Sequence, residues 1–236
     1  MISIVPTGPL GVNTLVVPLC GSYVFIVDPA CCPSCGDEEK LLSFIKQASL
    51  IPVAVVLTHG HFDHIAGARF VKEQFNIPLF ISREDSVCIG KEGENFQEES
   101  LRNIGFSSFL NQVENLPEPD GFLEEGKTLL EVYPEDFSCI KENEELKEKL
   151  SNWKVLLTPG HTEGSVCLYN KEEKLLISGD TVFYRSWGRT DLPGGSEAQI
   201  QKSLKRLYSE IPADTKVYPG HDYTGFSMYE NFGSRY

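Results

Sequence analysis

Three histidines and an aspartate occur within six positions of this chain, in the stretch THGHFDH (residues 58–64). The chain has only five histidines, and the other two lie in PGHTEGS and PGHDYT, where each follows a glycine. An isolated histidine is usually a hydrogen-bonded structural residue, whereas glycine beside histidine allows the tight turns that a metal-binding loop needs. We therefore expect a fold that brings these three segments together at one metal site. The five histidines are His59, His61, His64, His161 and His221.

Short apolar runs alternate with helical patterns along the chain, which indicates an α/β layered domain with helices covering sheets. Runs rich in β-branched and aromatic residues predict strands at residues 22–29, 52–59, 77–82, 154–160, 164–170, 174–180 and 215–221. Helical spacing predicts a helix N-capped by Asp37, a second helix over 66–75 and a third over 196–211. The third helix opens with a capping pattern from Ser196 to Gln199.

Length and composition favour a single domain over residues 1–236, because 41% of the residues are hydrophobic and can fill a core. No stretch approaches the roughly twenty uninterrupted apolar residues of a membrane-spanning helix, and the first residues do not resemble a cationic leader. Seven cysteines at irregular spacing favour reduced thiols over a disulfide framework. We therefore expect a cytoplasmic protein without a membrane partner, and the sequence leaves its oligomeric state open.

Most of the negative charge belongs to one segment. Residues 83–149 contain 18 acidic and 7 basic residues, in a chain whose formal net charge is −13. Because no basic surface is available for phosphates, nucleic acid is not an expected partner. We interpret residues 83–150 as an acidic insertion, either a cap over the metal site or a solvated surface. Leu146 and Leu150 lie on one side of a charged helix within it.

Four residues of metal-binding type directly follow predicted strands: His59, His161, Asp180 and His221. Loops converge into a crevice at the carboxyl ends of strands, and binding residues gather there. We therefore expect the four side chains to share one site.

The residue types and their spacing indicate a site for two metal ions. Histidine nitrogens suit transition metals, and an aspartate can bridge two ions. Residues 59–64 are too close together to share one helical face, so they are expected to form a loop around their ligands. In that loop His59 and His61 would reach one ion, while Asp63 and His64 would reach another.

The motifs THGHFDHIAG, TPGHTEGSVCLY, LISGDTVF and YPGHDYT, in this order, resemble the signature of the metallo-β-lactamase superfamily. The resemblance covers most of the chain and implies an αββα sandwich with a metal site at one edge. It implies two divalent ions, zinc in the simplest case, with iron and manganese as alternatives. The ligands that it implies are His59, His61 and His161 for the first ion, Asp63, His64 and His221 for the second, and Asp180 as a bridge.

A pair of ions of this kind lowers the pKa of a shared water and so produces a metal-bound hydroxide nucleophile at neutral pH. The same ions polarise the attacked carbonyl and stabilise the oxyanion. Asp63 is suited to orient the nucleophile, and no serine or cysteine nucleophile is required. The implied chemistry is therefore hydrolysis by a binuclear metal site, with Asp63 and Asp180 as catalytic residues.

The stretch DTVFYRSWGRTDLPGGS (residues 180–196) is similar to the glyoxalase II-like branch of the superfamily, whose type activity is the hydrolysis of S-lactoylglutathione. This resemblance implies a small-molecule thioester as substrate, with Arg189 and Tyr223 binding the glutathione part. Glyoxalase II typically carries a helical C-terminal domain with further cationic contacts, whereas 15 residues follow His221 here. The acyl group and the thiol carrier therefore stay open.

An alternative within the superfamily is a persulfide dioxygenase, which has a similar GRTD stretch. By that resemblance His59, His161 and Asp180 would hold a single Fe(II), and the substrate would be glutathione persulfide. The DLPGG that follows GRT here favours the hydrolase. A non-catalytic metal-binding protein is disfavoured by the complete set of ligand positions. The lack of a leader argues against β-lactamase activity, and the negative charge argues against RNA processing.

The sequence leaves the roles of two further features undecided. Cys31, Cys32 and Cys35 in CCPSC fit a redox pair, a zinc ligand pair or unreactive loop thiols. Asp28, in IVDPA, is expected to support a metal ligand and not to be one.

Overall fold

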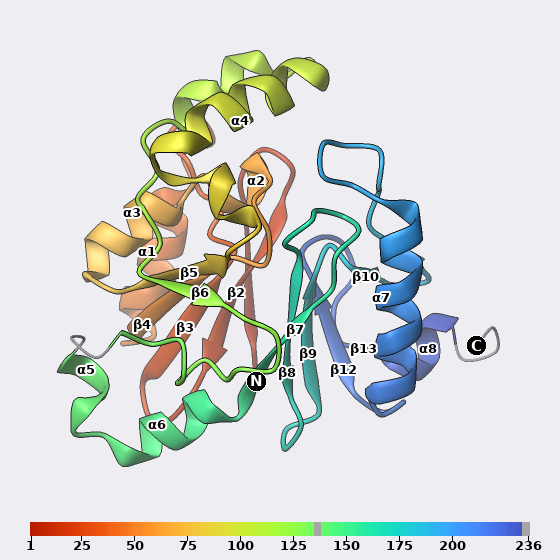
Figure 1. Ribbon diagram of the computed structural model, residues 1–236. Helices are drawn as coiled ribbons and strands as arrows, with labels where there is room; N and C mark the ends of the chain where they lie inside the picture. The colour runs from red at the N-terminus through yellow and green to blue at the C-terminus, as the bar shows by residue number, and fades with distance from the viewer. Residues whose placement is uncertain (135–137, 233–236) are drawn as a thin grey trace.

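The computed structural model describes residues 1–134 and 138–232. Two β-sheets lie face to face in the middle of the molecule, and helices cover the outer face of each (Figure 1). This is the αββα sandwich that the motifs implied. Among the described residues, no helix combines the length and apolar character needed to cross a membrane.

The first sheet has six strands in the order β1-β2-β3-β4-β5-β6. Strands β1 to β3 are antiparallel, whereas β3 to β6 run parallel. Parallel neighbours need crossover connections, which α1 and α3 provide on the outer face (Figure 1). The elements are β1 (Ser3–Thr7), β2 (Val12–Pro18), β3 (Tyr23–Val27), α1 (Glu38–Gln47), β4 (Ile51–Val56), α2 (Phe62–Ile65), α3 (Ala68–Phe75), β5 (Leu79–Ser82) and β6 (Gly121–Leu123).

The second sheet has the order β13-β12-β9-β8-β7, with β12 parallel to β9 and the other pairs antiparallel. A short hairpin of β10 and β11 follows β9, and α7 covers the outer face. The elements are β7 (Trp153–Leu157), β8 (Val166–Asn170), β9 (Leu175–Gly179), β10 (Val182–Phe183), β11 (Ser186–Trp187), α7 (Glu197–Glu210), β12 (Lys216–Pro219), β13 (Phe226–Ser227) and α8 (Met228–Phe232).

Buried apolar side chains form three layers in this sandwich. Phe25 of β3 and Trp153 of β7 meet edge to face between the sheets, with ring centroids 5.3 Å apart. A second layer lies between the first sheet and its helices and includes Leu41 of α1. A third layer packs Ile200 and Leu204 of α7 against the second sheet. Burial of these three layers is what holds the four-layer sandwich together.

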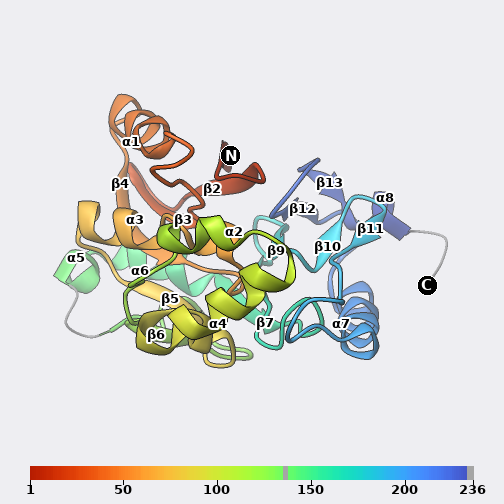
Figure 2. The same cartoon turned by 90° about the horizontal axis from the view of Figure 1, so that it is seen from above.

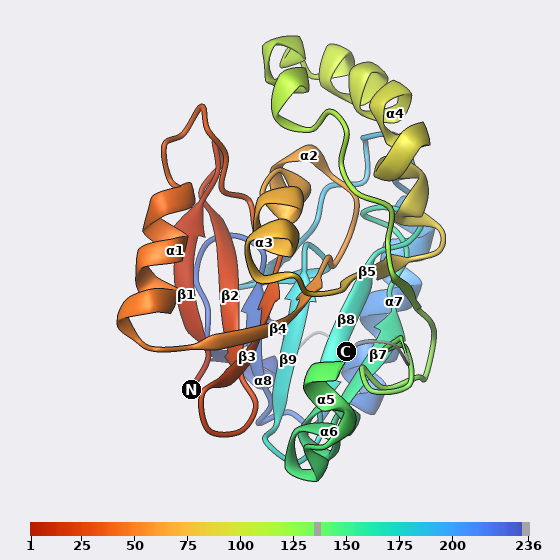
Figure 3. The same cartoon turned by 90° about the vertical axis from the view of Figure 1, so that its left-hand side faces the viewer.

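The acidic segment does not form one unit. It comprises η1 (Asp85–Cys88), α4 (Gly90–Asn103), η2 (Ser107–Gln112), β6, α5 (Ser138–Lys141) and α6 (Glu144–Ser151). Helix α4 stands beyond the strand ends, at the same end of the sandwich as α2 (Figures 1 and 3). Strand β6 pairs with β5, and α6 lies at the opposite end of the sandwich. Helix α6 is not simply solvated, because Leu146 and Leu150 are fully buried in the layer between the sheets.

Asp37 immediately precedes α1, but its side chain makes no capping hydrogen bond, contrary to the prediction. Its two carboxylate oxygens instead accept hydrogen bonds from the backbone N–H groups of Gly8 and Cys32. At α7 the predicted cap is present, since Ser196 Oγ accepts a hydrogen bond from Gln199 N.

Replacing Trp153 with alanine is expected to lower the free energy of unfolding by about 3–5 kcal/mol, because a large fully buried side chain leaves a cavity between the sheets. Tyr229→Ala is the matched control, since Tyr229 is an exposed aromatic residue, and it should change stability by less than about 0.5 kcal/mol. Urea denaturation of both variants measures the difference. Equal midpoints would contradict the assignment of Trp153 to the central core.

Candidate metal centre

Seven side chains of metal-binding type converge at one end of the sandwich. His59 follows β4, His161 follows β7, Asp180 follows β9 and His221 follows β12. His61 lies directly before α2, and that helix carries Asp63 and His64. In Figure 2, which looks onto this end, α2 lies near the middle of the view, between the first sheet and strands β9 and β10.

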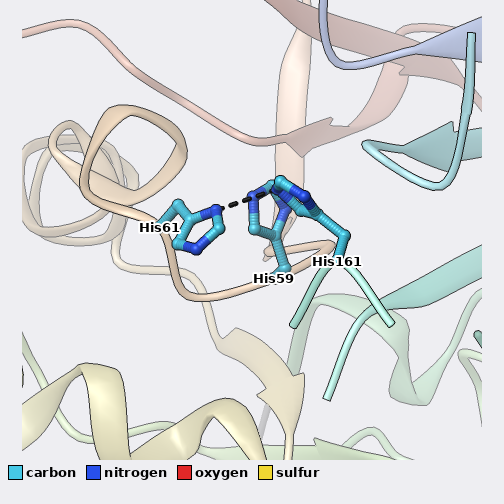
Figure 4. A group of neighbouring side chains, drawn as sticks. All are labelled: His59, His61 and His161. Carbon is cyan, nitrogen blue, oxygen red and sulfur yellow. Dashed lines mark hydrogen bonds between the residues drawn. The ribbon is translucent and has the colours of Figure 1, made fainter. Parts of the chain in front are cut away.

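The first group consists of His59, His61 and His161. One ring nitrogen of each lies within 4.8 Å of the others, so the three nitrogens could surround one ion. His61 Nδ1 and His161 Nε2 are 2.9 Å apart, and Figure 4 shows the His61 ring beside those of His59 and His161, with one nitrogen turned toward them. The rings are at most 5% exposed.

The second group consists of Asp63, His64 and His221, whose ligand atoms also lie within 4.8 Å of one another. His221 Nε2 is 3.2 Å from Asp63 Oδ2 and 3.2 Å from His64 Nε2. Short helix α2 therefore contributes to this group, while the loop before it contributes to the first group.

Asp180 lies between the two groups. Its Oδ2 is 3.5 Å from His161 Nε2, in the first group, and 3.7 Å from His221 Nε2, in the second. Its Oδ1 is 3.5 Å from His64 Nε2. One carboxylate thus reaches both groups, which is the position that a bridging ligand requires.

Unsatisfied atoms indicate that these residues fit metal ions. His59 Nε2, His61 Nε2 and Asp180 Oδ1 are buried without a hydrogen-bond partner. Leaving a buried polar atom unpaired costs free energy, and metal ions would coordinate His59 Nε2 and Asp180 Oδ1. His61 would bind through Nδ1, the nitrogen that lies toward His161. Gly220 also leaves the centre clear, because a Cβ at that position would overlap both Asp180 Oδ1 and His64 Cε1.

The protonation of the cluster is set by burial and by its carboxylates. Burial alone would lower the pKa of His64 and of His221, but the neighbouring Asp63 and Asp180 outweigh it and raise both. Burial lowers the pKa of His61 to about 3 and holds the pKa of His59 well below its ordinary value, so both rings are neutral and keep a lone pair for a metal. Burial alone would raise the pKa of Asp180, but the neighbouring His64 and His161 outweigh it and hold that pKa well below its usual range. Ionised carboxylate and neutral imidazole are the forms that bind metal ions.

Hydrogen bonds outside the cluster fix the orientation of two ligands. Asp28 Oδ2 lies 2.9 Å from His64 Nδ1, and Asp28 also accepts hydrogen bonds from the backbone N–H and hydroxyl of Thr58. His161 Nδ1 lies 2.8 Å from the carbonyl oxygen of Arg189 and donates to it. Because each Nδ1 is engaged, each Nε2 is left to face the centre. Asp28 thus lies beside the cluster, in contact with His64, as its position after a strand predicted.

Asp85 is a supporting residue that the sequence analysis missed. Its carboxylate accepts hydrogen bonds from Gly60 N at 2.9 Å, from Gly164 N at 2.7 Å and from Thr162 Oγ1 at 2.7 Å. Gly60 lies between His59 and His61, while Thr162 directly follows His161, so this one carboxylate ties the two ligand loops together. It is 3% exposed, and burial raises its pKa. No local motif marks Asp85, and only the contact across 77 positions of sequence identifies it.

A cavity of about 430 Å³ opens in front of the cluster. Six of the fifteen residues around it are apolar, and Ser100 and Ile104, from α4 and the residue that ends it, form part of its wall. The lining residues are Leu10, His61, Phe62, Asp63, Ser100, Ile104, His161, Asp180, Phe183, Ser186, Trp187, Arg189, Leu192, His221 and Asp222. Among the described residues of the acidic segment, those that line this cavity come from α4 and the residue that ends it.

Arg189 and Tyr223, which were expected to contact the substrate, lie at different places relative to this cavity. Arg189 lines the cavity, and its guanidinium makes two 2.7 Å hydrogen bonds with the carboxylate of Asp191. Tyr223 is 60% exposed and lies outside the cavity lining, in ring contact with Tyr184 and Phe226. The structure thus brings Arg189 to the cavity, while Tyr223 is at the surface beside it.

The αββα fold and the histidine and aspartate cluster define a class of metallohydrolases. Residues 7–221 match the family model of the metallo-β-lactamase superfamily, and the chain belongs to that superfamily. An uncharacterized protein of Aquifex aeolicus is 35% identical over 94% of this chain and 89% of its own length. The hydroxyacylglutathione hydrolase GloC of Haemophilus influenzae is 28% identical over 83% of this chain and 78% of its own.

Solved structures agree with this assignment. The B3 metallo-β-lactamase BLEG-1 superposes with a TM-score of 0.78 at 28% identity, over 99% of this chain and 97% of its own. TTHA1623 in a di-iron-bound form gives a TM-score of 0.71 at 30% identity, over 97% of this chain and 98% of its own. The metallo-β-lactamase fold binds divalent metals, and this chain has histidine and aspartate groups that could hold such ions.

Proposed function

We propose that this protein hydrolyses a small-molecule thioester of the S-lactoylglutathione kind, using two divalent metal ions, zinc in the simplest case. The observation that carries the proposal is that Asp180 lies within reach of two separate three-residue ligand groups. The first ion would be held by His59, His61 and His161, and the second by Asp63, His64 and His221. Similarity to GloC supports the substrate class, and similarity to the di-iron form of TTHA1623 supports a binuclear site.

Two metal ions, when bound, supply a water of lowered pKa as nucleophile and polarise the attacked carbonyl. The chain itself holds and orients the reacting groups. Asp63 lines the cavity, and interaction with His64 and His221 outweighs burial and keeps the pKa of its carboxyl below its ordinary value. It therefore stays ionised and can accept a hydrogen bond from the attacking water and orient it. Asp28 holds His64 in the tautomer that leaves Nε2 facing the centre.

The cavity would receive the substrate with its thioester carbonyl toward Asp180 and its acyl group among the apolar residues. Phe62, Ile104 and Trp187 form apolar walls that exclude water from the reacting bond. Arg189 is the guanidinium on the lining and would contact a glutathione carboxylate. For Tyr223 we propose a contact only with the part of glutathione that extends past the cavity. Six cysteines are free thiols, namely Cys20, Cys31, Cys32, Cys35, Cys88 and Cys167, which supports a cytoplasmic location.

Arg189→Met is expected to raise KM for a glutathione thioester about fivefold with little change in kcat, because an exposed charge contact contributes about 1 kcal/mol to binding. Asp191→Asn is the matched variant, and it should lower KM because it frees the Arg189 guanidinium from its ion pair. Steady-state kinetics on S-lactoylglutathione and on a neutral thioester of similar size test this. Equal effects of Arg189→Met on both substrates would argue against a glutathione contact.

The function is tested by release of thiol from S-lactoylglutathione by the zinc-loaded protein. Hydrolysis in the wild type and its loss in His61→Ala would support the proposal, since His61 belongs to the first ligand group. A protein that contains two metal ions per chain but releases no thiol from this or other thioesters would contradict it.

A further inference from the structure

The turn that precedes α1 brings two cysteines together. Cys32 O accepts hydrogen bonds from the backbone N–H groups of Cys35 and Gly36, each at 3.1 Å. Gly36 has a φ of 65°, a left-handed conformation that glycine adopts without strain, and a Cβ there would meet only open space. Backbone geometry and not crowding therefore requires glycine here. The turn closes the chain on itself, so that Cys35 returns to the neighbourhood of Cys32.

Three possible ligand atoms meet inside this turn. The sulfur atoms of Cys32 and Cys35 and a carboxylate oxygen of Asp37 all lie within 4.8 Å of one another. Two thiolates on a tetrahedral zinc ion lie about 3.8 Å apart, given zinc–sulfur bonds of about 2.3 Å. The Cys-x-x-Cys spacing is also the usual one for a pair of zinc ligands. The distances and the spacing both suit a thiophilic cation.

Asp37 is held beside the sulfur atoms by the backbone. Its Oδ1 accepts a 2.9 Å hydrogen bond from Cys32 N, and its Oδ2 accepts a 2.6 Å hydrogen bond from Gly8 N. These bonds explain why it does not cap α1. They leave lone pairs on both oxygens, so the carboxylate can still coordinate an ion.

The charge around the turn favours a cation. Three consecutive acidic residues, Asp37, Glu38 and Glu39, follow the turn. A divalent ion would offset this concentration of negative charge.

We propose that Cys32, Cys35 and Asp37 form a second metal site, separate from the histidine and aspartate centre, for a thiophilic divalent cation of the zinc class. Cys32 is fully buried and Cys35 is exposed, so the ion enters from the side of Cys35. Three protein ligands leave a fourth tetrahedral position for a water or an external thiol. Binding releases the protons of both thiols to solvent.

The test is a titration of the full-length reduced protein with Co²⁺, which gives a near-ultraviolet thiolate-to-cobalt absorption band only where sulfur is a ligand. None of the ligands of the other centre is a cysteine, so the band reports on this turn alone. We expect one equivalent of thiolate-bound Co²⁺ per chain in the wild type and none in Cys35→Ser. Ser34→Ala is the matched control, because it alters the same turn and removes no proposed ligand. It should keep the band.

A second variant tests the carboxylate. Asp37→Asn should keep the thiols but weaken Co²⁺ binding about tenfold. Because Cys35 is exposed, its replacement by serine leaves the core intact, and circular dichroism verifies this. The proposal is overturned if the wild type gives no thiolate band, or if the band persists in Cys35→Ser. It is also overturned if thiol titration of the untreated protein finds Cys32 and Cys35 joined as a disulfide.

Discussion

Asp180→Asn is expected to lower kcat/KM more than about a hundredfold and to reduce the bound metal per chain. Loss of a residue that only supports a ligand already costs about 10–100-fold, and Asp180 contacts both ligand groups directly. Asparagine keeps the shape of the side chain but has no negative charge to hold two cations. Elemental analysis and thioester kinetics on the same sample measure the two losses.

Asp222→Asn is the matched control for that variant. Asp222 lines the same cavity and carries the same charge, but it belongs to neither ligand group. Its φ of 61° is a conformation that asparagine tolerates. We expect metal content close to the wild type and activity within about threefold. If both variants lose metal equally, the negative charge of the cavity as a whole, and not a bridging position of Asp180, holds the ions.

Asp85→Ala is expected to weaken metal binding about 10–100-fold and to lower the free energy of unfolding by about 3 kcal/mol. The change leaves the N–H groups of Gly60 and Gly164 without their acceptor and frees both ligand loops to move. Glu84→Ala is the control, since Glu84 is the exposed neighbour. Metal affinity measured with a competing chelator, together with urea denaturation, gives both quantities. Unchanged affinity in a destabilised Asp85→Ala protein would limit Asp85 to a structural role.

The sequence predicted the buried strands well, because runs such as those of β4, β8 and β9 are apolar over almost their whole length. It did not predict the N-terminal pair β1 and β2. In this hairpin Pro6 and Asn13 lie opposite each other. Strand β1 is at the edge of the sheet, where a proline without an N–H removes no necessary hydrogen bond. Edge position depends on the tertiary fold and is not readable from a local pattern.

The convergence of the histidines and aspartates was predictable because these residues are concentrated in short motifs at the ends of strands. The supporting residues were predictable only in part. Asp28 follows a strand and could be placed near the site, whereas Asp85 acts through contacts with Gly60 and Thr162 that no local pattern encodes. The ion pair between Arg189 and Asp191 is likewise a matter of side-chain geometry, and it limits how far Arg189 alone can favour glutathione.

The most direct test of the binuclear account is elemental analysis of the metal bound to Cys35→Ser protein purified without a metal-chelating tag. This variant removes the proposed site in the turn before α1 and leaves only the histidine and aspartate centre to be counted. If the histidine and aspartate centre is binuclear, the protein should contain about two divalent ions per chain, with zinc prominent. One iron per chain and little other metal would contradict it, and would favour oxidation of glutathione persulfide at His59, His161 and Asp180.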